Sequence, residues 1–263
     1  MILKELINKS WYGSIGYIHN DSDIELLGSY LLHNQLVLDE FKGHIFAFTY
    51  NELNEEYLEN TISTLYPDAI IIYLDENRGH NFGTADLDNT VFDICKDLQV
   101  EWLCKASNDI ILQPEVLGIE IKEADFYYME GIGYGGMENW NFDFDKILNE
   151  YFYPQTNFYI INVSKTDYLT DKQYIDETYE YIQSVENYNG KIWEYIQDWT
   201  CEDFLKQCVE RNNLSKYNLI PQKTYIKLLE LIKREQIHDC SHKNIMIEGI
   251  CHYQYNNQNI IQI

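Results

Sequence analysis

Basic residues are scarce in this sequence, and their scarcity excludes one broad class of partner. The 263 residues include 19 Lys and Arg against 43 Asp and Glu, so the formal net charge is −24 at pH 7. A field of that sign repels nucleic acid, whose phosphates are also negative. A small anionic ligand remains compatible with the charge if a divalent cation neutralises it locally. We therefore expect no nucleic-acid partner.

Paired cysteines and long apolar runs are also lacking. None of the six Cys forms a Cys-x-x-Cys pair, and most lie in apolar or helical runs, which favours reduced thiols. The longest apolar run is far short of the about 20 residues that a membrane helix needs, so we expect no membrane span. The first nine residues carry Lys4, Glu5 and Lys9, unlike a secretory signal. These features predict a cytoplasmic protein.

Two common phosphate-binding motifs do not follow the expected strand 69–74. The glycine-containing turn there lacks the G-x-G-x-x-G spacing of a dinucleotide fingerprint, and no Gly-Lys-Ser/Thr run of a P-loop occurs in the chain.

The apolar pattern that is present predicts an α/β fold. Short apolar runs alternate with helical patterns through the first half of the chain, which is typical of βαβ units. We expect a mostly parallel central sheet with helices on both faces, in a single compact domain over residues 1–263. Expected strands are 14–18, 44–49, 69–74, 100–106, 124–129, 157–163 and 244–255, and expected helices are about 23–41, 54–65, a stretch ending near 98, 171–186, 200–211 and 222–236.

A glycine-containing turn follows the expected strand 69–74. Asn77 and Gly79 form an Asn-x-Gly motif, and Gly83 follows four residues later at the start of a helical pattern. Glycines at such a place let backbone N–H groups approach a phosphate near a helix N-terminus. An ordinary turn between a strand and a helix is the alternative.

A carboxylate follows the expected strand 100–106. Asp109 ends this buried strand, whereas the three Asp-x-Asp pairs elsewhere in the chain do not end one. Carboxylate oxygens and substrate phosphates are the ligands that hard cations prefer, so Asp109 is a candidate ligand for Mg²⁺ or Mn²⁺. The alternative is an aspartate that only caps a turn.

Two further residues have a catalytic and a structural interpretation. Asp203, at the start of a helical pattern, could take a proton from a hydroxyl group, but Thr200 three residues earlier also predicts a capping box. His252, in an apolar strand pattern, could bind the substrate's metal, or it could be a core histidine.

Taken in order from about Ser14 to His252, these features resemble the nucleotide-sugar glycosyltransferases of the GT-A fold, in particular the inverting family 2. The resemblance rests on the Asn77-Arg78-Gly79 turn, the Ser107-Asn108-Asp109 strand end and the Glu202-Asp203 helix start. Ser107 departs from the family, which has a first aspartate there.

The resemblance implies a function and a set of site residues. An inverting transferase of hexosyl or deoxyhexosyl type would use a nucleoside-diphosphate sugar as donor, a glycan or other hydroxyl as acceptor, and Mn²⁺ or Mg²⁺. Residues about 14–113 would bind the donor and about 114–255 the acceptor. Asp203 would be the catalytic base and Asp109 and His252 the metal ligands. Residues implied in donor binding are His19, Asn20, Asn51, Asn77, Gly79, Gly83, Ser107 and Asn108.

Two alternatives remain open at this point. A sugar nucleotidyltransferase would share the sheet and the metal chemistry, but it usually has a glycine-rich, basic phosphate loop near the first strand, which this chain lacks. A catalytically silent carbohydrate-binding or assembly protein on the same fold would explain Ser107.

Overall fold

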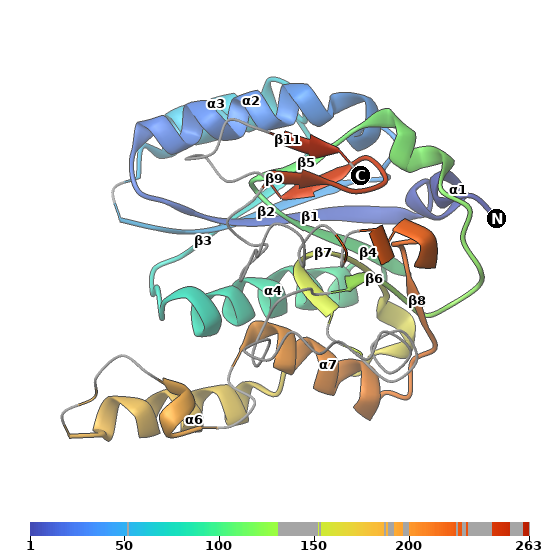
Figure 1. Cartoon of the computed structure of the whole chain (residues 1–263). Helices are drawn as coiled ribbons and strands as arrows, with labels where there is room; N and C mark the ends of the chain where they lie inside the picture. Colours follow the sequence, from blue (N-terminus) through green and yellow to red (C-terminus); the bar gives the residue numbers. More distant parts are fainter. Residues whose placement is uncertain are drawn as a thin grey trace.

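A seven-stranded sheet organises the chain, whose structure is a computed structural model (Figure 1). The structure describes residues 1–51, 53–130, 152, 154–186, 188, 192–196, 200–224, 226–227, 230, 244–252 and 260–262. The strand order is β3-β2-β1-β4-β7-β6-β8. The strands are β1 Ser10–Ile18, β2 His44–Tyr50, β3 Ile70–Leu74, β4 Trp102–Ser107, β6 Phe126–Glu130, β7 Pro154–Asn162 and β8 Lys216–Asn218.

The pairing within this sheet is mostly parallel. β1 pairs in parallel with β2 on one side and β4 on the other, and β3 extends the parallel set beyond β2. β7 runs antiparallel to β4 and β6, while β6 and β8 are parallel to each other. The predicted α/β fold class is therefore confirmed, and its four parallel strands are the four that the apolar pattern predicts.

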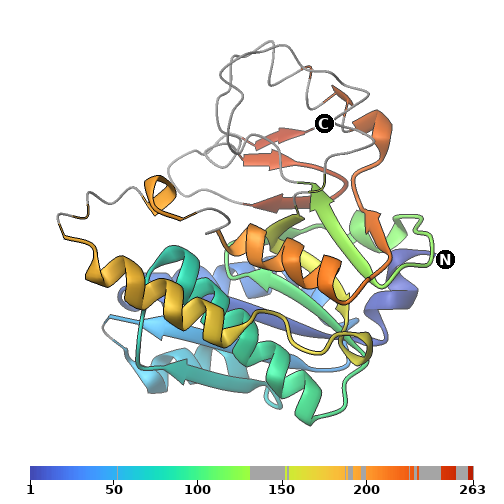
Figure 2. The same ribbon diagram turned by 90° about the horizontal axis from the view of Figure 1, so that it is seen from below.

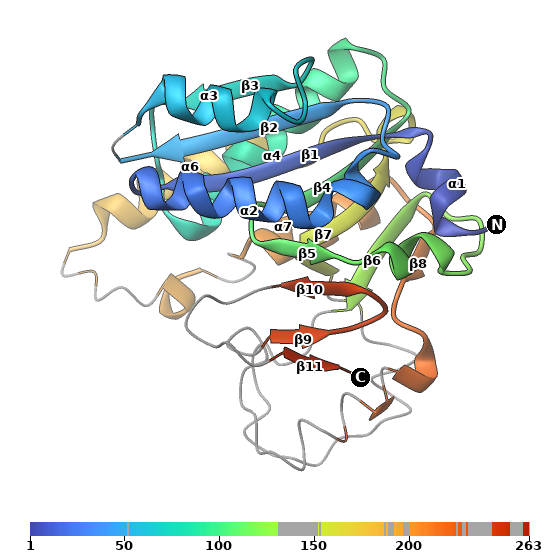
Figure 3. The ribbon, with the colours of Figure 1, turned by 90° about the horizontal axis from the view of Figure 1, so that it is seen from above.

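Helices cover both faces of the sheet. In Figures 1 and 3, α2 (Asp21–Leu38) and α3 (Glu55–Ser63) lie over one face, while Figure 2 shows α4 (His80–Asp97) and α7 (Cys201–Arg211) on the other. α6 (Lys172–Ser184) packs outside α4 and α7, through apolar contacts that include Phe82, Ile175 and Phe204. The shorter helices are α1 Leu3–Ile7 and the 3₁₀ turns η1 Pro114–Gly118, η2 Val163–Lys165 and η3 Ile192–Glu194.

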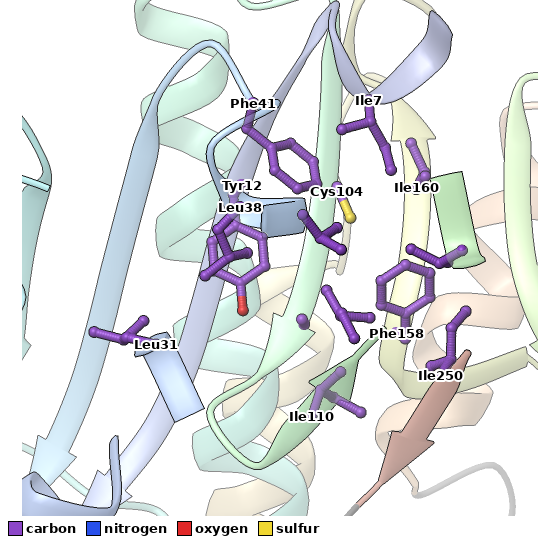
Figure 4. Packing of buried hydrophobic residues seen from close by; sticks show 14 of the residues in the cluster. Ile7, Tyr12, Leu31, Leu38, Phe41, Cys104, Ile110, Phe158, Ile160 and Ile250 are labelled. Carbon is purple, nitrogen blue, oxygen red and sulfur yellow. The ribbon is translucent and has the colours of Figure 1, made fainter. Parts of the chain in front are cut away.

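The two faces bury separate apolar clusters. Figure 4 shows the cluster under α2, where Tyr12 and Cys104 of the sheet pack with Leu31 and Leu38 of the helix. The opposite cluster joins Ile15 of β1 to Val91 of α4 and Leu205 of α7. Alternation along β1 explains the division, because successive side chains of a strand point to opposite faces.

The predicted strand 244–255 is wrong as a single element. Its residues 244–252 form two short strands, β9 (Asn244–Met246) and β10 (Ile250–His252), with an antiparallel bridge between Ile247 and Ile250, and residues 253–255 lie outside the described residues. Glu248 and Gly249 turn the chain with φ of 49° and 83°, and a left-handed pair ends an extended run. β10 pairs antiparallel with β5 (Ile110–Leu112), and β9 pairs in parallel with β11 (Ile260–Gln262).

Some elements of the structure are too short to be predicted from the sequence. β5, β8, β11 and α1 are too short for their patterns to stand out, and none was expected. Most of the expected helix 222–236 lies outside the described residues. None of the helices in the part of the chain that the structure describes combines the length and the apolarity needed to cross a bilayer.

The five described cysteines are free and buried. Burial raises the pKa of the Cys95 thiol on α4 and that of the Cys208 thiol on α7 to about 12. Burial also raises the pKa of Cys104 in β4 above its usual value. These thiols are therefore protonated and shielded at neutral pH, in agreement with the expectation of reduced cysteines.

A buried ion pair links the sheet to α4. Lys105 is fully buried in β4, and its Nζ lies 3.3 Å from Asp88 Oδ1. The ammonium also donates to the carbonyl oxygen of Thr156 in β7 and lies 5.7 Å from the ring centre of Tyr159. Burial raises the pKa of the Asp88 carboxyl to about 6, although Lys105 opposes that rise. The charged form of Asp88 is thus disfavoured by burial more than its partner stabilises it.

We predict that Asp88 lowers the free energy of unfolding as the pH rises. In the unfolded chain this aspartate releases its proton near the ordinary pKa of 3.8, whereas the folded carboxyl holds it until about pH 6. The stability that Asp88 contributes is therefore complete below the unfolded pKa and is lost as the pH rises to about 6. Asp88→Asn cannot titrate, so its free energy of unfolding should gain on the order of 2 kcal/mol relative to wild type between pH 4 and pH 6.

Urea denaturation at pH 4, 5, 6 and 7 measures this difference. Asp97→Asn, an exposed position at the end of the same helix, is the control for the loss of a carboxylate. A constant difference between Asp88→Asn and wild type across this range would contradict the prediction.

Candidate functional site

The polar ends of the parallel strands meet at one edge of the sheet. Ile18 of β1 is opposite Tyr50 of β2, and Thr49 of β2 is opposite Leu74 of β3, so these three strands end level with one another. The residues that follow, including His19 and Asn51, are exposed at that edge. In open α/β sheets, ligands bind beyond the carboxyl ends of the strands.

β4 ends earlier than its neighbour β1, and this produces a step in the edge. Ser107, the last residue of β4, is opposite Ile15, and the Asn108 N–H donates to the Ile15 carbonyl at 2.9 Å. β1 continues three residues further, to Ile18, which is about 10 Å of strand. Ser107 and Asn108 therefore lie beside β1, below the level of His19.

Gly16 of β1 makes room for Asn108. A Cβ atom at Gly16 would collide with the Asn108 side-chain amide. The absence of a side chain at Gly16 thus lets the Asn108 amide lie directly against the β1 backbone.

Asp109 lies in the turn between β4 and β5. β5 is paired on one edge with β10, where His252 is opposite Ile110, so the backbones of Asp109 and His252 are close neighbours. On its other edge, β5 is bound by the buried amide of Asn34 in α2, which donates to the Ile110 carbonyl at 2.6 Å and accepts from the Leu112 N–H at 2.8 Å. The structure therefore brings together, at the backbone level, the two residues expected to bind a metal.

The Asn77–Gly83 turn forms the start of α4. Asn77 Oδ1 accepts from the Gly79 N–H at 2.9 Å, and Gly79 has φ of 86°, a value that favours glycine. A Cβ at Gly83 would lie 3.0 Å from Asn77 Oδ1. Both glycines are thus explained by the turn itself, and the exposed Gly79 leaves backbone at the helix N-terminus open to an anion.

Arg78, inside this turn, has its charge neutralised by the protein. Its guanidinium donates to both carboxylate oxygens of Asp86 at 2.5 and 2.8 Å and to Asp176 at 2.6 Å. The ring of Tyr179 lies below it at 5.2 Å. These contacts join the turn to α4 and α6, so Arg78 serves the shape of the turn.

The start of α7 contains the predicted capping box. Thr200 Oγ1 accepts from the Asp203 N–H at 3.1 Å, and Asp203 Oδ2 accepts from the Thr200 N–H at 3.1 Å and from its hydroxyl at 2.7 Å. A similar local bond forms at Asn20, which caps α2 by accepting from the Ser22 N–H at 2.9 Å.

The start of α7 lies beside the C-terminal end of β4 and the first turn of α4. Glu202 accepts a hydrogen bond from the Thr156 hydroxyl at 3.0 Å, and Thr156 is two residues from Phe158, which is opposite Ala106 near the end of β4. The ring of Phe204 in α7 lies 6.4 Å from that of Phe82 in α4. The Asn77–Gly83 turn, the Ser107–Asp109 strand end and the Glu202–Asp203 helix start thus lie at one edge of the sheet, although they are distant in sequence.

Two polar residues of this region, Lys105 and Thr156, were not expected from the sequence. The Tyr50 hydroxyl donates to Asp75 at 2.9 Å across the ends of β2 and β3. Lys105 and Thr156 lie at the junction of β4 and β7. A lysine inside an apolar strand is the one signal that could have been noticed, because lysine is almost never fully buried without a partner.

A metal centre is not formed by the described side chains alone. Among the residues that the structure describes, no group of three or more His, Cys, Asp or Glu side chains is arranged to hold an ion. Metal binding by Asp109 and His252 stays a prediction.

Comparisons with known proteins give only distant likenesses. No protein-family model matches the sequence, and no curated protein matches it either. Among solved structures, the chain is similar to a nucleoside-diphosphate-sugar pyrophosphorylase from Vibrio cholerae, with 12% identity, coverage of 83% of this chain and 99% of that one, and a TM-score of 0.40.

Two further solved structures are similar at the same level. The galactosyltransferase LgtC, in complex with donor and acceptor sugar analogues, has 8% identity over 92% of this chain and 86% of that one, with a TM-score of 0.41. A candidate nucleotide-diphospho-sugar transferase from Desulfovibrio desulfuricans has 9% identity over 80% and 79%, with a TM-score of 0.37. Likenesses this distant assign no function to the chain.

We predict that two glycines of β1 differ in their tolerance of a methyl group. At Gly16, the atoms in the way are the end of the Asn108 side chain, so Gly16→Ala should change the rotamer of Asn108 and cost less than about 1.5 kcal/mol. At Gly13, a Cβ would lie 2.5 Å from Val91 and 2.9 Å from Leu103 in the packed core, so Gly13→Ala should cost about 1–3 kcal/mol. Chemical denaturation of both variants measures the order, and the reverse order would be inconsistent with the packing described.

Proposed function

We propose that this protein is an inverting glycosyltransferase that moves a sugar from a nucleoside-diphosphate donor to an acceptor hydroxyl. The observation that supports it best is the convergence of the Asn77–Gly83 turn, the Ser107–Asp109 strand end and the Glu202–Asp203 helix start at one edge of a parallel sheet. Each motif is common alone, but this edge is where open α/β sheets bind ligands.

The donor would bind along the ends of β1 to β4. His19 and Asn51 would contact the nucleoside, since they are exposed where β1 and β2 end level. Asn20 would take part through its amide nitrogen, because its side-chain oxygen caps α2. The backbone at Gly79 would approach the diphosphate, while Asn77 and Gly83 shape the turn around it.

The donor set near Asp109 suits a divalent cation. A carboxylate oxygen fits Mg²⁺ or Mn²⁺, and an imidazole nitrogen from His252 would favour Mn²⁺ of the two. Ser107 and Asn108 would contribute neutral oxygens beside Asp109. When bound, the cation would supply positive charge to the departing diphosphate.

Asp203 would act on the acceptor. Its carboxylate would take the proton from the acceptor hydroxyl while the oxygen forms a bond to the anomeric carbon and the carbon–diphosphate bond breaks. Attack on the face opposite the leaving group inverts the anomeric configuration. One oxygen of Asp203, Oδ2, already accepts two bonds from Thr200, so the proton would go to Oδ1.

One observation favours a second candidate function. The capping box gives Asp203 a complete structural role, so the helix start would look the same in a catalytically silent carbohydrate-binding protein. Turnover of a nucleotide sugar in Mn²⁺, screened after a thermal-shift panel of donors, separates the two functions, because a ligand that binds the native state raises the melting midpoint.

We predict that Asp109→Ala abolishes Mn²⁺-dependent binding of UDP or GDP. The substitution removes the only carboxylate in the Ser107–Asp109 strand end. Calorimetric titration with and without Mn²⁺ measures the affinity, and circular dichroism confirms that the variant is folded. Equal affinity in the variant and in wild type would exclude Asp109 from the metal site.

We predict that Asp203→Asn lowers turnover by roughly 10²-fold or more, the scale of general base catalysis, and leaves donor affinity nearly unchanged. Thr200→Ala is the matched control, because it removes the cap oxygen and keeps the Asp203 carboxylate. It should cost about 1 kcal/mol of stability and retain most of the turnover. Measurement of turnover and melting midpoint on both variants tests the assignment, and a fully active Asp203→Asn enzyme would end it.

A further inference from the structure

β7 is irregular next to the start of α7. Tyr128 of β6 is opposite Tyr159 of β7, whereas Glu130 is opposite Pro154, so a step of two residues along β6 corresponds to five along β7. Such irregularities release backbone groups from the ladder and re-aim side chains. Thr156 lies within this irregular segment, and it is buried.

The carbonyl and the hydroxyl of Thr156 have partners from other elements. Its carbonyl accepts a hydrogen bond from the Lys105 ammonium of β4. Its hydroxyl donates to Glu202 Oε1 in the first turn of α7 at 3.0 Å. The Cys201 thiol donates to the other oxygen, Glu202 Oε2, at 3.2 Å. The carboxylate of Glu202 is therefore fixed at both oxygens.

The buried Lys105 ammonium strengthens the contact between β4 and the irregular segment of β7. A charged donor makes a shorter and stronger bond to a carbonyl than a neutral donor does. Lys105 is held in place by Asp88 of α4 and by the ring of Tyr159 in β7. Its only described carbonyl acceptor is that of Thr156, so the charge acts on the irregular segment of β7 and not on the regular ladder.

We propose that Lys105 and Thr156 are positioning residues that fix Glu202 and, with it, the first turn of α7 that carries Asp203. Lys105 holds the irregular segment through the Thr156 carbonyl, and the Thr156 hydroxyl holds the Glu202 carboxylate. Neither residue needs to touch a substrate. The kinetic consequence rests on the proposed function, whereas the structural consequence does not.

Thr156→Val and Thr156→Ser form the test. Valine keeps the size and the backbone carbonyl but removes the hydroxyl, whereas serine keeps the hydroxyl. In Thr156→Val, the amides of Asp203 and Phe204 should exchange with solvent faster than in wild type, and in Thr156→Ser their protection should return. With turnover established, kcat of the valine variant should fall roughly tenfold to 10²-fold while KM for the donor changes little, because misplacement by about 1 Å is costly to catalysis.

A second pair of variants tests Lys105. Lys105→Met combined with Asp88→Asn removes the bond to the Thr156 carbonyl without leaving an unpaired buried charge, and Asp88→Asn alone keeps that bond. The double variant should show the faster exchange at Asp203 and Phe204 that Thr156→Val shows, and the single variant should show less.

The outcomes separate this proposal from the proposed function. Wild-type exchange rates in Thr156→Val, or a serine variant as impaired as the valine variant, would overturn the positioning role. If wild type turns over no nucleotide sugar in the panel, the proposed function fails, and the exchange rates still decide the role of Thr156.

Discussion

The pairing of β1 on both of its edges is the constraint on which the rest of the molecule depends. β1 forms parallel ladders with β2 and β4 at once, and each of its faces is covered by a helical layer. A strand in that position is fixed in register, because a shift of one residue would exchange its two buried faces. The register in turn sets how far each neighbour extends, and hence which residues meet beyond the strand ends.

Polar groups near the strand ends have structural partners of their own. Asn20, Asn77 and Asp203 each accept from a backbone N–H group at the start of a helix. Side chains that satisfy such N–H groups are of the same types that bind phosphates, metals and hydroxyls. The structural role of these residues is therefore compatible with the proposed transferase chemistry.

The sequence predicts the parallel half of the sheet well because its signals are local. The strands before Asn51 and Asp75 are continuous apolar runs, the strand before Ser107 is mostly apolar, and the helices between them have apolar stripes. The C-terminal part depends on contacts between distant segments. The pairing of Ile110 with His252 joins residues more than 100 positions apart along the chain, and a pattern within one window contains no trace of it.

The residues of the candidate site likewise fall into those located by local sequence and those located by distant contacts. Asn77, Gly79 and Asp109 follow predicted strands and could be located from the sequence. The role of Thr156 depends on an irregularity in β7 that only the pairing with β6 reveals. Lys105 was visible as a charge in an apolar strand, but its partners Asp88 and Thr156 come from elements that are 17 and 51 residues away.

The reactivity of the buried thiols can report how often the helical layers of this protein separate from the sheet. Cys95 and Cys208 lie on the α4 and α7 side of the sheet, and Cys104 lies on the α2 side. An alkylating reagent reacts with a thiolate that solvent can reach. While the layers are closed these thiols are protonated and buried, so they react slowly. The rate at which each cysteine is modified would therefore report how often its own layer separates from the sheet. Mass spectrometry of proteolytic peptides after timed alkylation would then rank the two layers by their opening free energies without any engineered label.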